Sequence, residues 1–162
     1  RPLPLVSTVE PVKLRETQRG EFIHAVLSDI EFLGADVEKT VAAAIERRKY
    51  ELRGGFAAEN VAKTVLEFLR IPAVAAYFAS QKDRTVLNEQ EVVDRTGALH
   101  RIDRLVVDAG TVTVLDYKTG EENTSYNEQV EEYMEIVRTM YPGKTVRGVL
   151  LYVDRKTERE VA

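Results

Sequence analysis

The sequence predicts an α/β fold in which a small mixed sheet of four strands, flanked by helices, follows an N-terminal helical region. Apolar residues recur at helical spacing as far as about residue 80, and after Lys82 the segments become short and rich in β-branched residues. One more helical segment precedes the last strand, which suits a helix that covers a sheet. The length of 162 residues suits one domain, which we expect over residues 16–162.

Residues 16–80 are predicted to be the helical part of this domain. Because the chain starts with Arg1 rather than Met, we expect it to be a piece of a longer protein, with residues 1–15 as a proline-containing linker. Helical spacing begins at about Thr17 and ends at Gly34. The other expected helical segments are a second helix capped by Asp36 and ended by Gly54-Gly55, a third over 58–69, and a short turn over 73–79.

Residues 81–162 are predicted to form the sheet and one further helix. Three segments rich in β-branched residues and separated by turn residues favour a meander, and a fourth strand follows the helix. Ser125 and Glu128 fit a capping box that opens this helix, and Pro142-Gly143 ends it. The expected strands are 85–94, 99–108, 111–118 and 145–153, and the helix is 125–141.

Composition excludes several classes of protein. Charged residues make up 31% and apolar residues 44%, which indicates a globular chain rather than a disordered one. No run reaches the roughly 18–20 apolar residues that span a membrane, so no membrane association is expected. The absence of cysteine excludes disulfides and a cysteine-bound iron–sulfur cluster, and it suits a reducing, cytoplasmic compartment. The net charge of −4 does not by itself indicate a nucleic-acid partner.

The second and third predicted strands bring two carboxylates together. If a two-residue turn joins them, Leu105 lies opposite Val114, and on the same side Asp103 lies opposite Asp116. Lys118, two residues beyond Asp116, leaves the same face. Opposed side chains in a sheet have Cβ atoms about 4.5–5.5 Å apart, so the two carboxylates are expected to be neighbours.

Two like charges this close repel each other, and a shared cation is one way to hold both. Carboxylates with open positions suit Mg²⁺ or Mn²⁺, and together with Lys118 such a site could hydrolyse a phosphodiester. The alternative from spacing alone is that Asp103 and Asp116 form ordinary ion pairs with a basic side chain such as Arg101 or Arg104.

Five segments in order resemble the RecB-type nuclease family of the PD-(D/E)XK superfamily, which often forms the C-terminal domain of RecB- and AddA-like helicase-nucleases. The most specific segment is Leu115-Asp116-Tyr117-Lys118-Thr119-Gly120, which follows an apolar strand. The other segments are Gly20-Glu21-Phe22-Ile23-His24, Glu89-Gln90-Glu91, Arg101-Ile102-Asp103-Arg104, and Gln129 with Tyr133. The resemblance implies a restriction-endonuclease-like core.

The resemblance also implies a role for each matched residue. The implied metal ligands are His24, Asp103, Asp116 and the backbone carbonyl of Tyr117. The implied catalytic residues are Lys118, Asp116, Asp103, Gln129 and Tyr133, with Gln129 and Tyr133 helping to position the substrate and the lysine. Glu89 matches an acidic residue commonly seen ahead of the strand that carries Asp103. His100 has no assigned role in the family, and we expect it to be a solvated strand residue. The charges of Glu131 and Glu132 are likewise expected to be solvated.

The implied function is a DNA nuclease domain, an exodeoxyribonuclease dependent on Mg²⁺ or Mn²⁺ that leaves 5′-phosphate ends. Its implied partners are single-stranded DNA or duplex ends, and a helicase motor in the same parent chain or in a partner subunit. The setting would be double-strand-break repair and recombination. Two alternatives remain at this point: a catalytically inactive nuclease-like module that binds DNA or a helicase partner, and a purely structural docking domain.

Overall fold

The computed structural model of the chain describes residues 11–52 and 57–161. The helices are α1 (Pro11–Ser28), α2 (Val37–Arg48), α3 (Ala58–Leu69), α4 (Pro72–Ala75) and α5 (Ser125–Met140), with 3₁₀ turns η1 (Lys49–Glu51) and η2 (Ala76–Phe78). The strands are β1 (Thr85–Val93), β2 (Leu99–Val107), β3 (Thr111–Lys118), β4 (Thr145–Tyr152) and β5 (Thr157–Val161). Among these described residues, no helix has both the length and the apolar content to cross a bilayer.

The sheet is mixed, and its strands follow the order β1-β2-β3-β4-β5. The first three strands form the expected antiparallel meander, and β4 is parallel to β3, with α5 as the crossover that a parallel pair requires. The prediction of four strands was wrong, because β5 pairs antiparallel with β4 at the edge of the sheet. This strand carries exposed charged and polar residues before a single buried one, Val161, so no apolar alternation marks it in the sequence.

Most predicted boundaries in the helical part are confirmed, with two differences. Helix α1 begins at Pro11 rather than near Thr17, because proline is tolerated in the first helical turn. Asp36 caps α2 as predicted and its side chain accepts a hydrogen bond from the Lys39 backbone N–H. Helix α2 then tightens into η1 after Arg48. The expected linker residues 1–10 and the glycine pair Gly54-Gly55 lie outside the described residues.

The predicted capping box at the start of α5 was wrong. The N-cap position is Thr124, whose side chain makes no capping hydrogen bond. Asn123 instead accepts hydrogen bonds from the backbone N–H of Ser125 at 3.0 Å and from its hydroxyl at 2.9 Å. An asparagine side chain commonly makes this contact two residues along the chain, and here it competes successfully with the serine.

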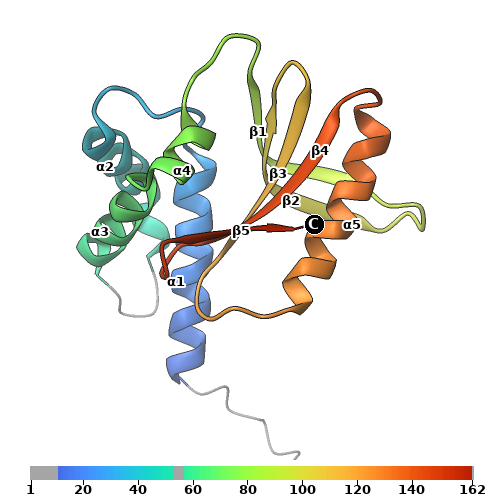
Figure 1. Ribbon diagram of the computed structural model, residues 1–162. Helices are drawn as coiled ribbons and strands as arrows, with labels where there is room; N and C mark the ends of the chain where they lie inside the picture. The colour runs from blue at the N-terminus through green and yellow to red at the C-terminus, as the bar shows by residue number, and fades with distance from the viewer. Residues whose placement is uncertain (1–10, 53–56, 162) are drawn as a thin grey trace, which may run out of the picture.

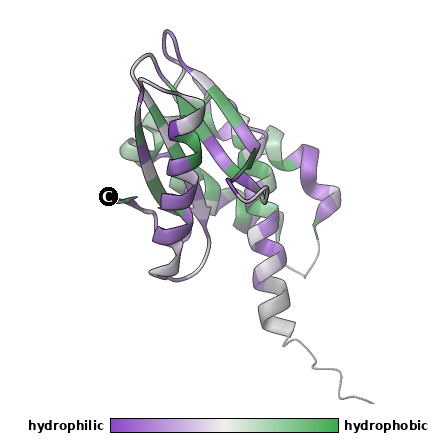
Figure 2. Ribbon diagram, turned by 90° about the vertical axis from the view of Figure 1, so that its right-hand side faces the viewer, coloured by the Kyte–Doolittle hydropathy of each residue, from purple (hydrophilic) through white to green (hydrophobic). Residues whose placement is uncertain are grey.

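Two apolar cores lie on opposite faces of the sheet. One face packs against α1 to α4, which gather on one side of the sheet in Figure 1, and the other face packs against α5. Figure 2 shows hydrophilic residues on the outer face of α5 and apolar strands behind it. Helix α5 comes close to β4 because Gly148 has no side chain: a Cβ atom there would lie 2.5 Å from Met134 Sδ.

The largest fully buried side chain is a charged one, Arg104 on β2. Its guanidinium donates hydrogen bonds to the carbonyl oxygens of Ile30 (2.7 Å), Glu31 (2.6 Å) and Tyr77 (3.0 Å). It also lies over the ring of Phe78, 4.0 Å from the centroid. Burial lowers the pKa of Arg104. The guanidinium therefore ties the chain that follows α1, and the η2 turn, to the middle of the sheet.

Replacement of Arg104 is expected to destabilise the fold strongly. The substitution Arg104→Met would remove the guanidinium's hydrogen bonds to three carbonyl oxygens that are buried or partly buried, so we expect a loss of about 3 kcal/mol or more in the free energy of unfolding. Urea denaturation followed by circular dichroism measures this loss. As a control, the exposed Arg95→Ala in the β1–β2 turn should change stability by less than about 0.5 kcal/mol. Equal stabilities of the two variants would contradict this account of Arg104.

Candidate active site

The centre of the site is Asp103, where β2 leaves regular pairing. The predicted register of β2 and β3 is confirmed, with Leu105 opposite Val114, and the ladder ends at the pair Arg104 and Leu115. Asp103 and Asp116 are therefore not a ladder pair, which corrects that part of the expectation. Instead, the Asp103 side chain accepts a hydrogen bond from the Tyr117 backbone N–H at 2.8 Å. A carboxylate oxygen thus takes the place of a backbone acceptor at this point of the sheet.

The backbone opposite Asp103 on β1 is also irregular. Extension of the β1–β2 register would place Glu89 against Asp103, but the ladder omits this pair. Glu89 has a φ of 49°, in the left-handed region that non-glycine residues rarely adopt. Strain of this kind persists where the surrounding structure imposes it, and it concentrates at functional sites. Asp103 is thus released from pairing on both sides.

Asp103 and Asp116 lie close enough to perturb each other's ionisation. Burial, followed by the charge of Asp103, raises the pKa of Asp116, and Lys118 opposes this shift only in part. Burial alone would raise the pKa of Asp103, but the hydrogen bond and the charge of His24 outweigh it, so that pKa is lowered. The pair therefore has the mutual repulsion that a shared cation would relieve.

His24 reaches the same place from α1. Its Nε2 lies 2.8 Å from the Tyr117 carbonyl oxygen and 3.4 Å from Asp103 Oδ2, and its Nδ1 lies 2.8 Å from the Gly20 carbonyl oxygen. Both ring nitrogens face carbonyl oxygens, which only the doubly protonated ring can satisfy together. Burial lowers the pKa of His24, but the hydrogen bond and charge of Asp103 and the two carbonyls outweigh it and raise this pKa to about 9.

Gly20 explains why the histidine can be there. A Cβ atom at this position would lie 2.8 Å from the Thr119 hydroxyl, in the segment just after β3. Without a side chain, α1 can approach the end of β3, and His24 follows one helical turn later. The spacing of Gly20 and His24 thus has a physical reason. Gly20 allows α1 to approach the end of β3, and His24, one turn later, then reaches the Tyr117 carbonyl and Asp103.

Lys118 occupies the side of the site next to α5. Its ammonium lies 2.9 Å from Asp116 Oδ2 and donates a hydrogen bond to Gln129 Oε1 at 2.9 Å. Its nitrogen also lies over the ring of Tyr126, 4.5 Å from the centroid. Sequence reasoning missed Tyr126, although it precedes Gln129 by three residues and so shares its helix face.

Tyr133 completes the set on α5. Its side chain is buried, and burial followed by the charges of Asp116 and Asp103 raises its pKa to about 12. Gln129 lies near enough to the Tyr133 hydroxyl to lower that pKa in part. The structure thus brings together every site residue that the sequence indicated. The alternative of ordinary ion pairs holds for Asp116, which pairs with Lys118 at 2.9 Å, but not for the two arginines named, since Arg101 lies 4.0 Å from Glu89 and Arg104 binds carbonyl oxygens.

Comparison with known proteins accounts for this arrangement. The family model of the PD-(D/E)XK nuclease superfamily matches residues 4–162, which is nearly the whole chain. The chain belongs to the PD-(D/E)XK nuclease superfamily. Members of this superfamily are metal-dependent nucleases, and the mixed sheet flanked by helices agrees with a restriction-endonuclease-like fold. A search of curated proteins found no match.

The donor set suits the divalent metal on which PD-(D/E)XK nucleases depend. The carboxylates of Asp103 and Asp116 and the Tyr117 carbonyl offer hard oxygen ligands, and His24 offers a nitrogen. Asp116 Oδ2 is buried and has no hydrogen-bond partner among the described residues, although the Lys118 ammonium is near. Lys118 leaves part of the repulsion between the two carboxylates uncompensated, because burial and the charge of Asp103 still raise the pKa of Asp116. The residues present therefore fit a divalent metal.

A cleft of about 560 Å³ leads to the site in this nuclease fold. Asp103 and His24 line it together with Glu89, Arg101 and residues of α1. A second hollow, of about 640 Å³, continues along α1 past the segment after β3. The two share Thr17 and Thr119 in their walls, so an extended substrate could lie along α1 and reach Asp103.

The His24–Asp103 pair predicts a pH dependence of stability for the metal-free protein. Because the folded-state pKa of His24 is raised to about 9, the stabilisation is complete below pH 6.5 and is lost as the pH rises through 9. In EDTA, the melting temperature of the wild type should therefore fall more between pH 7 and 10 than that of His24→Gln, which cannot titrate. Thermal melts at constant ionic strength measure this difference, and parallel curves would contradict it.

Proposed function

We propose that this chain is a DNA nuclease domain of the RecB type, which hydrolyses phosphodiester bonds with Mg²⁺ or Mn²⁺ and acts as an exonuclease fed by a helicase motor. The observation that carries the proposal is the continuous series of contacts in which His24 meets the Tyr117 carbonyl and Asp103, Asp103 neighbours Asp116, and Asp116 meets Lys118. Membership of the nuclease superfamily supports hydrolysis, and the matched motifs support the RecB-type subdivision.

Each residue has a distinct task in this proposal. Asp103, Asp116, the Tyr117 carbonyl and His24 would hold the divalent metal, which supplies Lewis-acid stabilisation of charge on the phosphate. Lys118 lies on the α5 side of the carboxylates, where its ammonium can orient the attacking water or neutralise a phosphate oxygen. Its three contacts, with Asp116, Gln129 and Tyr126, fix that ammonium in place.

Gln129 and Tyr133 act as positioning residues. The Gln129 side chain accepts from Lys118, so it sets the direction of the ammonium. Tyr133 is buried behind it and stays protonated, because its pKa is raised to about 12. Its hydroxyl can therefore donate a hydrogen bond toward the carboxylates or toward a substrate oxygen at neutral pH.

The charges near the cleft favour a substrate that is delivered rather than captured. Arg19 is held by Asp154 through two hydrogen bonds of 3.1 and 2.7 Å, and Glu89, Glu121 and Glu16 also line the two hollows. The basic run at the end of α2 is likewise engaged, since Arg48 pairs with Asp29 and Lys49 pairs with Glu46. Arg19, Arg48 and Lys49 are thus engaged by carboxylates rather than available to a DNA backbone, which supports a helicase motor as the source of the strand.

Loss of catalysis without loss of fold is expected for Asp116→Asn and Lys118→Ala. Both variants should degrade linear single-stranded DNA on the order of 100-fold more slowly or worse. Asp116→Asn also removes the carboxylate repulsion, so its melting temperature in EDTA should equal or exceed that of the wild type. Release of labelled nucleotides measures cleavage, and the exposed α5 substitutions Glu131→Gln and Arg138→Ala are the controls.

The same assay distinguishes the proposal from a nuclease-like module without activity. A wild-type chain that cuts no DNA with Mg²⁺ or Mn²⁺ would overturn the enzyme assignment. If both single variants, Asp116→Asn and Lys118→Ala, cleaved DNA at the wild-type rate, the assignment of the site would be overturned. Degradation of circular single strands as fast as linear ones would overturn exonuclease action and leave the metal-dependent chemistry standing.

Mg²⁺ is expected to stabilise the wild-type fold. A ligand that binds only the native state stabilises it, by about 2.7 kcal/mol at 100 times its dissociation constant. The melting temperature should therefore rise with MgCl₂ for the wild type and not for Asp103→Asn, which lacks the shared carboxylate. NaCl at matched ionic strength controls for screening. A rise of the same size in Asp103→Asn would place the stabilising Mg²⁺ elsewhere.

A further inference from the structure

A second group of side chains of metal-ligating types lies where the β1–β2 hairpin meets α5. Asp94 follows β1, His100 is on β2 and Glu132 is on α5, and one ligand atom from each lies within 4.8 Å of the others. His100 Nε2 is 2.7 Å from Asp94 Oδ2 and 3.4 Å from Glu132 Oε1. From the sequence, His100 and Glu132 were predicted to be solvated residues, because 32 positions separate them and nothing in the local pattern links them.

The Asp94 carboxylate is held in position by the hairpin turn. Its Oδ1 accepts hydrogen bonds from the Thr96 backbone N–H at 2.8 Å, from the Thr96 hydroxyl at 2.6 Å and from the Ala98 backbone N–H at 3.0 Å. These donors occupy Oδ1 and leave Oδ2 directed at His100. Outer contacts of this kind orient a ligand atom before a metal arrives.

His100 and Glu132 are placed by packing on two other elements. The His100 ring packs edge-on against Tyr133, with centroids 5.9 Å apart, and its side chain is 22% exposed. Glu132 precedes Tyr133 on α5, so its carboxylate reaches the imidazole from the solvent side. The imidazole therefore faces two carboxylates that come from different elements, an arrangement that a single surface ion pair does not need.

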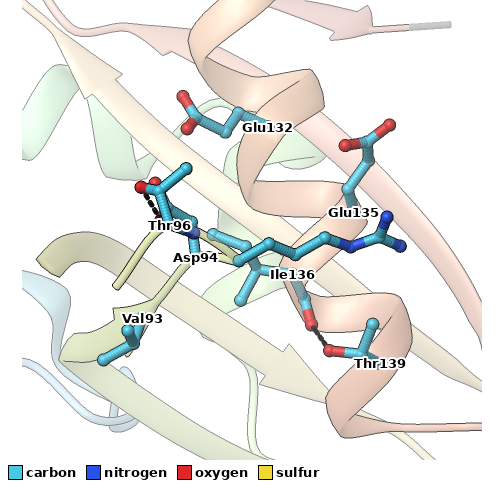
Figure 3. Close-up of a pocket in the computed structure, with 8 residues that line it drawn as sticks. Val93, Asp94, Thr96, Glu132, Glu135, Ile136 and Thr139 are labelled. Atoms are coloured by element: carbon cyan, nitrogen blue, oxygen red, sulfur yellow. Dashed lines mark hydrogen bonds between the residues drawn. The ribbon is translucent and has the colours of Figure 1, made fainter. Parts of the chain in front are cut away.

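A cavity of about 220 Å³ borders the group, and Figure 3 shows Asp94 and Glu132 at its rim. Glu135, Ile136 and Thr139 of α5 line the rest of that wall in the same view. The cavity gives a water molecule room beside the carboxylates of Asp94 and Glu132.

We propose that Asp94, His100 and Glu132 form a second divalent-metal site, which takes Zn²⁺ with water as the fourth ligand. Zinc binds imidazole nitrogen and carboxylate oxygen at about 2.0–2.2 Å in tetrahedral geometry, which separates ligand atoms by about 3.3–3.5 Å. The distance between His100 and Glu132 already meets this, and Asp94 Oδ2, now hydrogen-bonded to Nε2 at 2.7 Å, would move away by about 0.6 Å as the metal replaces the shared proton. The metal would fasten the hairpin to α5 against the ring of Tyr133.

Zinc titration of the wild type and three variants tests this site. With Mg²⁺ present in excess, calorimetry should show one Zn²⁺ equivalent that is weakened at least about 100-fold in His100→Gln and Glu132→Gln. Glu135→Gln, which changes a carboxylate of the same cavity outside the group, is the matched control and should bind as the wild type does. The Glu132 side chain is 48% exposed, so Glu132→Gln is expected to fold even if His100→Gln does not fold.

The outcome is independent of the nuclease proposal. The rise of melting temperature with MgCl₂ should be unchanged in Glu132→Gln, and the Zn²⁺ equivalent should persist in Asp103→Asn. Equal zinc binding by the wild type and Glu132→Gln, or an equal loss in Glu135→Gln, would overturn the second site. Absence of any such equivalent in the wild type would also overturn it and make the group a plain ion-pair cluster.

Discussion

Two neighbouring residues of β2 connect the helical half of the molecule to the sheet. Arg104 turns to the α1 side and binds the carbonyls of Ile30 and Glu31, just after α1 ends. Asp103, next to it, binds His24 in the middle of the same helix. Helix α1 is therefore fixed to one strand at two points, and one of these points is the proposed active site. The position of His24 relative to the carboxylates follows from this buried guanidinium, which cannot move without exposing carbonyl oxygens to an apolar core.

The proposed metal site lies where the sheet gives up regular pairing. Asp103 leaves both ladders, its side chain accepts the Tyr117 N–H, and Glu89 opposite adopts a positive φ. The Tyr117 carbonyl then faces His24 at the same edge. Without a cation, the raised pKa of Asp116 reflects a repulsion that the fold carries, whereas the protonated ring of His24 pairs with Asp103 and stabilises the fold. A divalent cation would replace that proton and relieve that repulsion, so the same strain that weakens the metal-free fold favours metal binding.

The sequence predicted the register of β2 and β3 because a short turn and matched apolar residues determine it. It could not predict that the ladder ends at Arg104, since a carboxylate that competes with the backbone leaves no trace in apolar spacing. The role of Arg104 was hidden for a similar reason, because a charged residue beside Asp103 is expected to form an ion pair rather than to be buried among carbonyls. Strand β5 and the Asn123 cap were missed where polar contacts, rather than apolar periodicity, decide the structure.

The balance of charge bears on how such a nuclease would select its substrate. Nucleic-acid affinity depends on unpaired cations that displace counterions from the backbone, and Arg19, which lines the hollow along α1, is already paired with Asp154. Under the proposed function, the domain therefore contributes chemistry and little affinity, and the motor contributes the strand. The rate at which the nuclease domain cleaves a delivered strand would then depend only weakly on the salt concentration. An acidic net charge is no contradiction of nuclease activity, because a domain that held DNA tightly would also slow the strand that the motor supplies.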